Sequence, residues 1–199
     1  GSGVYVSGEQ ILQFTLASTS SGVRRNGTQI AVNNGTYAAS TLTGNFTVNG
    51  RSSSQGHAGM TGAIGEFIYL SSNPSADTRQ KIEGYLAHKW GLQGDLSVGH
   101  PYEASAPSPW NPTDLSPTIW LDANDTGYLS SKDHYVKTWK DLSGNGRDAT
   151  AANFSSGPVV MPNQLNGKPL VRFNLGETLS IADPRTMPMT VYVVGRQFT

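Results

Sequence analysis

Short runs of apolar and β-branched residues recur along the chain and are separated by turn-forming residues, a pattern typical of an all-β protein. In the first half, residues 4–19 partly alternate between apolar and polar positions, and residues 62–70 form the most apolar run. The second half contains four further runs of this kind, at residues 118–121, 135–139, 170–173 and 189–194. We predict strands in these segments, with residues 62–70 at the centre of a sheet.

The segment from Ser75 to Trp90 departs from the β pattern. Its apolar residues recur at spacings of three, one and four, which is the stripe of an amphipathic helix. Asn73 or Ser75 can cap its start, and Gly91 follows the last apolar residue as a stop signal. We predict one helix here.

Turn-forming residues mark a hairpin and a connector. Asn26-Gly27 lies between two short β-capable flanks and favours a two-residue hairpin turn, because both residues tolerate positive φ. Arg24 and Arg25 precede this turn; we expect a solvated hairpin tip, with contact to an acidic partner as the alternative. Residues 99–117 are rich in Pro, Ser and Ala, which predicts an extended connector without regular ladder hydrogen bonds.

The composition agrees with a β-domain and excludes several kinds of chemistry. The 199 residues include 23 glycines and 11 prolines, as expected for many short strands joined by turns. Fourteen basic and fourteen acidic residues cancel and are scattered, so we expect no nucleic-acid partner. The absence of cysteine excludes disulfides, thiolate metal sites and cysteine nucleophiles. No segment approaches the roughly 18 apolar residues of a membrane span, so we expect no membrane insertion.

Several short segments of the sequence resemble laminin G-like, concanavalin A-like jelly-roll domains of phage and bacterial surface proteins. The second half resembles the opening of such a domain at residues 120–123 (WLDA), 139–149 (WKDLSGNGRDA) and 166–173 (NGKPLVRF). The first half resembles its closing part at residues 25–28, 64–68, 82–92 and 100–102. The resemblance implies an all-β, two-sheet jelly-roll sandwich with one short helix.

The order of the two halves is reversed relative to this family. Residues 1–98 resemble its C-terminal half, residues 99–117 form the connector, and residues 118–199 resemble its N-terminal half. Three explanations are open: a circular permutation within one domain, an excerpt across two tandem domains, or halves completed by neighbouring chains. We favour one permuted domain over residues 1–199, because either half alone would expose strand edges and an unfilled core. Exchange between subunits is the main rival.

Concanavalin A-like folds include glycoside hydrolases, but the residues for hydrolysis are missing from this sequence. Those enzymes need two carboxylates facing one sugar bond, and the pattern Glu-x-Asp-x-x-Glu is absent. Glu66 stands alone in its strand, where we expect a structural ion pair or a solvent-facing position. The histidines show no metal spacing; we expect His88 at the surface and His100 in the packing of the connector. We therefore predict a protein that is not an enzyme, with a hydrolase or lyase as the least favoured alternative.

A glycine-rich loop carries the strongest hint of a metal. Asp141, Asn145 and Asp148 combine side-chain oxygens with glycines, a combination that serves calcium sites and sharp turns alike. Asp122 opens a second small oxygen cluster, which could share the cation or initiate a turn. We expect turns at both places and keep calcium at these four residues as the alternative.

Three residues are candidates for ligand binding. Trp110 lies in the connector, whereas the other tryptophans lie in apolar contexts that suit the core. Its indole could stack on a sugar, although packing of the connector onto the sandwich is the favoured interpretation. Gln55 and His57 lie in a polar, glycine-rich stretch that could supply adaptable hydrogen bonds.

These observations predict a non-catalytic binding or display module, outside the cell or on a virion surface. By the family resemblance, its expected partner is a glycan or surface polysaccharide. The alternative is a structural or assembly domain of a virion, which forms homo-oligomers or binds other virion proteins.

Overall fold

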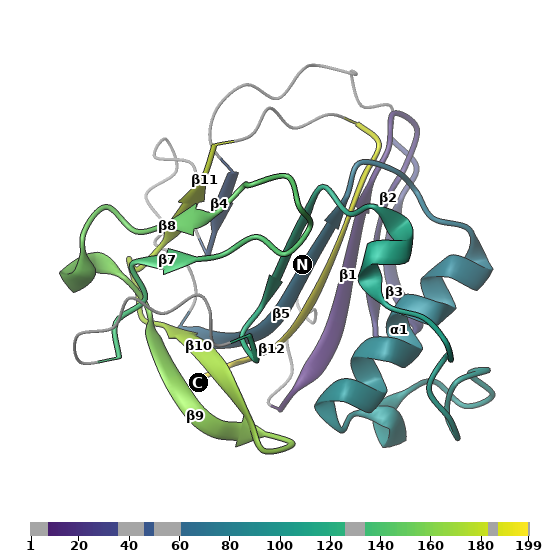
Figure 1. The fold of residues 1–199 in the computed structure, drawn as a ribbon. Helices are drawn as coiled ribbons and strands as arrows, with labels where there is room; N and C mark the ends of the chain where they lie inside the picture. The colour runs from purple at the N-terminus through teal and green to yellow at the C-terminus, as the bar shows by residue number, and fades with distance from the viewer. Residues whose placement is uncertain (1–7, 36–45, 50–60, 126–133, 183–186, 199) are drawn as a thin grey trace.

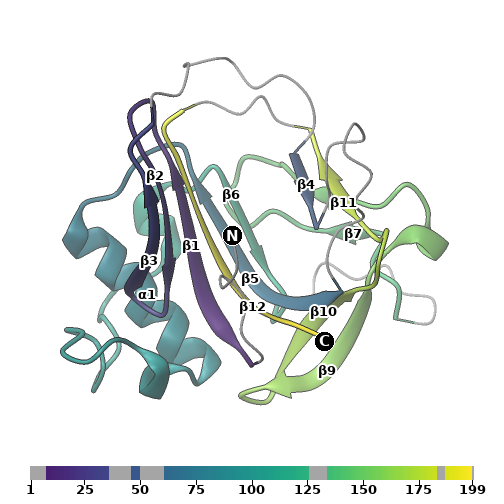
Figure 2. The same cartoon turned by 180° about the vertical axis from the view of Figure 1, so that it is seen from behind.

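The structure, a computed structural model, describes residues 8–35, 46–49, 61–125, 134–182 and 187–198. These residues form a β-sandwich of two antiparallel sheets with eight and four strands, together with one α-helix (Figures 1 and 2). The prediction of a two-sheet sandwich with a helix is confirmed. None of the helices in the described residues is long and apolar enough to span a membrane.

The larger sheet contains strands from both halves of the chain. Its strands are β1 (Gln10–Leu16), β2 (Ser21–Arg25), β3 (Thr28–Asn33), β5 (Gly62–Leu70), β6 (Ile119–Asp122), β9 (Val159–Leu165), β10 (Lys168–Phe173) and β12 (Met189–Gln197). Their order is β3-β2-β1-β12-β5-β10-β9, with β6 also paired to β5. β5 thus pairs with three strands from the second half. A permuted single domain over residues 1–199 requires this pairing, and that assignment stays a prediction.

The smaller sheet and the helix cover opposite faces of the larger sheet (Figures 1 and 2). The smaller sheet has the order β4-β11-β8-β7, with β4 (Phe46–Val48), β7 (Thr138–Trp139), β8 (Ala149–Thr150) and β11 (Leu179–Ile181). On the face covered by the smaller sheet, the ring centres of Phe46 and of Phe67 in β5 lie 5.4 Å apart. On the other side, the neighbouring Glu66 meets Trp90 of the helix α1 (Ala76–Trp90). β5 is buried at every position, which explains its continuous apolar run.

The helix α1 begins and ends where its sequence signals predict. The Ser75 side chain caps the first turn, and Gly91 takes the left-handed conformation, with φ of 75°, that ends the helix. Ile82, Leu86 and Trp90 are fully or almost fully buried, so the predicted apolar stripe is the face that packs on the sheet. The helix prediction is confirmed.

The hairpin of β2 and β3 turns at Asn26-Gly27, as predicted. Both residues have positive φ, 49° and 84°. Two hydrogen bonds hold the turn in place. The side-chain oxygen of Asn26 accepts one from Ile11 N at 2.8 Å, and the backbone carbonyl of Asn26 accepts the other from Ser97 N at 3.0 Å. The hairpin tip is therefore packed against β1 and the segment after α1, and the expectation of a solvated tip is wrong.

Four strands lie where none was predicted. Three of them, β4, β8 and β11, have only two or three residues, which is too short for a period to show. The fourth, β9, contains Pro162, and it tolerates this residue because it lies at the edge of the sheet. Of the strand predicted at residues 135–139, only Thr138–Trp139 forms a strand. The connector, predicted to be extended, contains a 3₁₀ turn at Pro112–Leu115.

The connector folds back across α1. Tyr102 packs against Gly84 so closely that a Cβ added to Gly84 would lie 2.4 Å from Tyr102 Cβ. The Tyr102 carbonyl lies 2.8 Å from His88 Nε2. His88 is therefore half-buried instead of lying at the surface as predicted, because the connector covers it.

The Gly84→Ala variant tests this packing. Alanine favours a helix interior over glycine by about 1 kcal/mol, yet we expect Gly84→Ala to lower the free energy of unfolding by about 1–2 kcal/mol because the new methyl group overlaps Tyr102. Chemical denaturation measures this difference. In a Tyr102→Gly background the same substitution should become neutral or stabilising; a stabilised single variant would show that the connector does not pack here.

Candidate functional site

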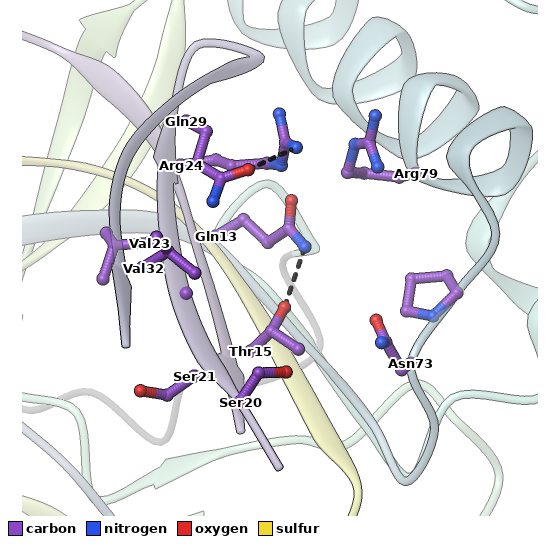
Figure 3. A pocket seen from close by; sticks show the side chains of 12 residues that line it. Gln13, Thr15, Ser20, Ser21, Val23, Arg24, Gln29, Val32, Asn73 and Arg79 are labelled. Atoms are coloured by element: carbon purple, nitrogen blue, oxygen red, sulfur yellow. Dashed lines mark hydrogen bonds between the residues drawn. The ribbon is translucent and has the colours of Figure 1, made fainter. Parts of the chain in front are cut away.

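A polar groove lies between one end of the larger sheet and the start of α1 (Figure 3). Its volume is about 250 Å³. It is lined by Gln13, Thr15, Ser20, Ser21, Gly22, Val23, Arg24, Gln29, Val32, Asn73, Pro74 and Arg79. Hydroxyl, amide and guanidinium groups provide most of this lining, and it contains no carboxylate. We call this site the groove.

Residues of β1 and β2 that lie on the face of the sheet towards α1 form one wall of the groove. Gln13 on β1 lies opposite Arg24 on β2, and Thr15 lies opposite Gly22, so these residues share one face of the sheet. Arg79 comes from α1 and forms the facing wall. Figure 3 shows Arg24 and Arg79 at one end of the groove and Asn73 towards the other.

The two arginines bring positive charge to one end of the groove. The guanidinium of Arg24 donates to the Gly27 carbonyl at 3.1 Å and to Gln29 Oε1 at 2.9 Å, which holds it in place. Arg79 Nε lies 3.6 Å from Glu83 Oε1. Burial, and secondly the cation of Arg79, lower the pKa of Arg24 from its ordinary value. The two cations are therefore close enough to repel each other.

Gln13 presents an unused acceptor in the groove. Its side-chain amide donates to Thr15 Oγ1 at 3.0 Å, whereas its Oε1 has no hydrogen-bond partner among the described residues. Only 6% of Gln13 is exposed. Tyr192, which pairs with Gln13 across β1 and β12, is fully buried, and its hydroxyl also lacks a partner in that part of the chain. Buried polar groups of this kind usually have a partner, and for Gln13, which lines the groove, a bound ligand would supply one.

A buried acid lies behind Arg79. Glu83 Oε2 is 3.1 Å from His100 Nε2, so His100 belongs to the packing of the connector, as predicted. Burial raises the pKa of Glu83, while the hydrogen bond with His100 and the charge of Arg79 act in the opposite direction. The Glu83 carboxylate, which lies 3.6 Å from Arg79, offsets part of the positive charge of the groove.

Glu66 lies at the centre of the molecule and has no exposed surface. Its carboxylate accepts hydrogen bonds from Trp90 Nε1 at 2.7 Å, Trp120 Nε1 at 2.8 Å and the Tyr85 hydroxyl at 3.1 Å. Lys89 Nζ lies 2.8 Å from it. Of the two expectations for Glu66, the structural ion pair is confirmed and the solvent-facing position is wrong.

Lys89 links this carboxylate to Asp122. Its Nζ lies 2.6 Å from Asp122 Oδ2 and 2.9 Å from the Tyr85 hydroxyl. Burial raises the pKa of Glu66, and the charge of Lys89 opposes that change. Both acids are engaged by donors of the protein itself, so this cluster holds the fold together and offers a substrate no free carboxylate.

The loop after β7 is organised around the carboxylate of Asp141. Oδ1 accepts hydrogen bonds from the backbone amides of Trp120 and Ser143, each at 3.0 Å, and Oδ2 accepts from Arg147 N at 3.0 Å. The Ser143 hydroxyl lies 2.7 Å from Oδ2. Asp148 Oδ1 in turn accepts from Asp141 N at 2.9 Å. These contacts are those of a side chain that stabilises a turn.

The four residues predicted to share a calcium ion have separate roles in this structure. Asn145 donates its side-chain amide to the Pro117 carbonyl at 3.0 Å and so joins the loop to the segment before β6. Asp122 pairs with Lys89. Within the described ranges, no group of three or more His, Asp or Glu side chains could hold a metal ion. The hydrogen bonds agree with the turns that we expected, and calcium binding stays the untested alternative.

Trp110 lines a second cavity. This cleft has a volume of about 510 Å³ and is lined by Lys81, Tyr102 and residues 105–110. Trp110 is half-buried and meets the ring of Tyr85 edge-on, with ring centres 5.4 Å apart. The packing of the connector onto the sandwich is therefore confirmed. Gln55 and His57 lie outside the described residues.

Comparisons of the chain with known protein families, with curated proteins and with solved structures find no match. Functional inference therefore depends on the structure, in which the groove and the cleft around Trp110 are the candidate sites. Of the groove residues, only Arg24 carried a hint in the sequence, as one of two arginines before a hairpin turn. Most of the others lie with Arg24 in the segment from β1 to β3, whereas Asn73, Pro74 and Arg79 come from a distant segment that meets it only when the sheet and α1 pack together.

Glu66→Gln tests the central cluster. An amide would direct N–H groups towards the indole and ammonium donors, so we expect the free energy of unfolding to fall by about 3 kcal/mol. The matched control is Glu9→Gln, which breaks the 2.7 Å pair of Glu9 with Arg196 at a partly exposed position; its cost should stay below about 1 kcal/mol. Equal costs in denaturant titrations would contradict a structural role for Glu66.

Asp141→Ala distinguishes a turn from a calcium site. Removing the carboxylate leaves the loop amides without their acceptor, and we expect a loss of about 1–3 kcal/mol in thermal or chemical unfolding. The loss should be the same with added calcium and with a chelator. If the chelator instead destabilises the unsubstituted protein and has no effect on the variant, the loop binds calcium.

Proposed function

We propose that the protein is a non-catalytic carbohydrate-binding module that acts outside the cell or on a virion surface. The observation that carries this proposal is the groove, a concave site with polar side chains on several sides. The proposal includes the finer fold assignment, a concanavalin A-like jelly roll whose two halves are permuted.

The groove has the chemistry that a sugar needs. A sugar ring presents hydroxyl groups that both donate and accept, and the groove offers acceptors, donors and groups of both kinds. Thr15, Ser20 and Ser21 supply hydroxyls, while Gln29 and Asn73 supply amides. Its volume of about 250 Å³ lies just below the range of drug-sized sites, which suits a ligand of about one sugar ring.

The arrangement of the acids supports binding without catalysis. Glycoside hydrolysis needs one carboxyl group as acid and another as base or nucleophile. Glu66 is saturated by donors, and Glu83 lies behind Arg79 in contact with His100. Neither carboxylate lines the groove.

The cleft around Trp110 is the second candidate site for the same function. It combines the edge of an indole with Tyr102 and the cation of Lys81. Aromatic side chains are suited to the apolar faces of sugars. Trp110 is, however, already packed on Tyr85, so the groove is the stronger candidate.

One observation favours the alternative of an assembly domain. β3 lies at the edge of the larger sheet, five of its six residues are exposed, and Val32 is 58% exposed. An exposed edge strand can pair with a strand of another chain. Virion assembly through homo-oligomers is therefore our second candidate function, and the solution mass by light scattering tests it.

A glycan array, followed by calorimetry with the glycans that bind, tests carbohydrate binding. We expect Asn73→Ala to weaken binding about two- to tenfold, because one neutral hydrogen bond is lost. Asn34→Ala is the matched control, since Asn34 is exposed and does not line the groove. Trp110→Ala should leave the affinity unchanged. Loss of binding only in Trp110→Ala would move the site to the cleft, and an array without any signal would contradict the proposed function.

A further inference from the structure

We infer that the groove selects an acidic saccharide and holds its carboxylate between Arg24 and Arg79. This inference rests on the proposed carbohydrate binding and adds the class of sugar. It is carried by the two guanidinium groups that face the same cavity and by the buried acceptor of Gln13 between the two walls (Figure 3).

The charges of the groove favour an anion. Among the described residues, its lining includes two cations and no carboxylate. Glu83 lies 3.6 Å from Arg79, and a single carboxylate can cancel at most one of the two charges. A net positive charge therefore stays at this end of the groove. A negative group placed between Arg24 and Arg79 would relieve the repulsion between their charges.

The geometry of the arginines suits a carboxylate. Guanidinium groups bind planar carboxylates through parallel N–H donors. Arg24 is held in place by the Gly27 carbonyl and by Gln29, so little side-chain entropy is lost when a ligand binds. The hairpin that carries Arg24 is itself fixed through Asn26, which bonds to Ile11 and Ser97.

The rest of the groove suits the ring that carries the acid. Gln13 Oε1 is a buried acceptor without a partner among the described residues, and a sugar hydroxyl can donate to it. The hydroxyls of Ser20 and Ser21, with Asn73, line the part of the groove further from the two arginines. An acid without a polyol body would leave the buried acceptor of Gln13 without a donor, so the lining favours an acidic sugar over a simple carboxylate.

An array of matched neutral, carboxylated and sulfated glycans tests the inference. We expect the carboxylated glycans to bind and their neutral counterparts to bind at least about tenfold more weakly, because a charge-assisted pair is lost. Arg79→Gln and Arg24→Gln should each reduce this preference about tenfold. Arg25→Gln is the matched control, since it removes the same charge one residue along β2 without touching the groove lining. Binding of the carboxylated glycans should also weaken as salt rises.

The outcomes separate this inference from the proposed function. If neutral or only sulfated glycans bind, carboxylate selection is overturned and carbohydrate binding stands. If no glycan binds, both fail. Arg24→Gln could disturb the hairpin, so each variant is first melted thermally; Arg79→Gln removes the facing charge without altering the hairpin bonds. An unchanged preference in a folded Arg79→Gln variant would overturn the inference.

Discussion

The fold depends on a carboxylate in its centre. Glu66 lies in β5, an interior strand of the larger sheet, and accepts hydrogen bonds from Trp90 and Tyr85 of α1 and from Trp120 of β6. Lys89 adds an ion pair, and its Nζ also lies 5.2–6.0 Å from the centres of three aromatic rings. A buried carboxylate is unfavourable unless donors surround it. Because Trp90, Tyr85 and Lys89 come from α1 and only Trp120 comes from β6, the burial of Glu66 in β5 is compensated in full only when the helix is docked. The acid therefore specifies where α1 lies on the sheet.

The same docking creates the groove at the other end of the helix. The C-terminal turn of α1 is held by the Glu66 cluster, and its N-terminal half carries Arg79 over β1 and β2. Ser97, which follows the helix, bonds to Asn26 and so ties the β2–β3 hairpin to the same body. Both walls of the groove are therefore fixed to one scaffold. A site between fixed elements loses little freedom when a ligand binds, which is the condition for selectivity by a few charged and polar groups.

Strong local patterns were sufficient to predict the β class, the strand at residues 62–70, α1 with its end at Gly91, and the hairpin turn at Asn26. The partners of Glu66 could not be predicted, because Trp120 lies 54 residues away and an acid in an apolar run carries no sign of what will surround it. β9 was missed because a proline such as Pro162 is tolerated in a strand only at the edge of a sheet. Which strands lie at an edge depends on how all the strands pair, and a local sequence pattern does not show this pairing. The groove was missed for a related reason, since Asn73, Pro74 and Arg79 meet the segment from β1 to β3 only when α1 packs on the sheet.

The acids explain how a chain without net charge can form a cationic site. Acidic and basic residues are equal in number, fourteen each. Several acids are, however, used within the fold: Glu66 and Asp122 pair with Lys89, and Asp141 holds the loop after β7. Arg24, by contrast, donates among the described residues to two neutral acceptors, a carbonyl and an amide, and it faces a cavity. The selectivity that we infer therefore follows from where the fold places its carboxylates, which neither the composition nor the net charge can show.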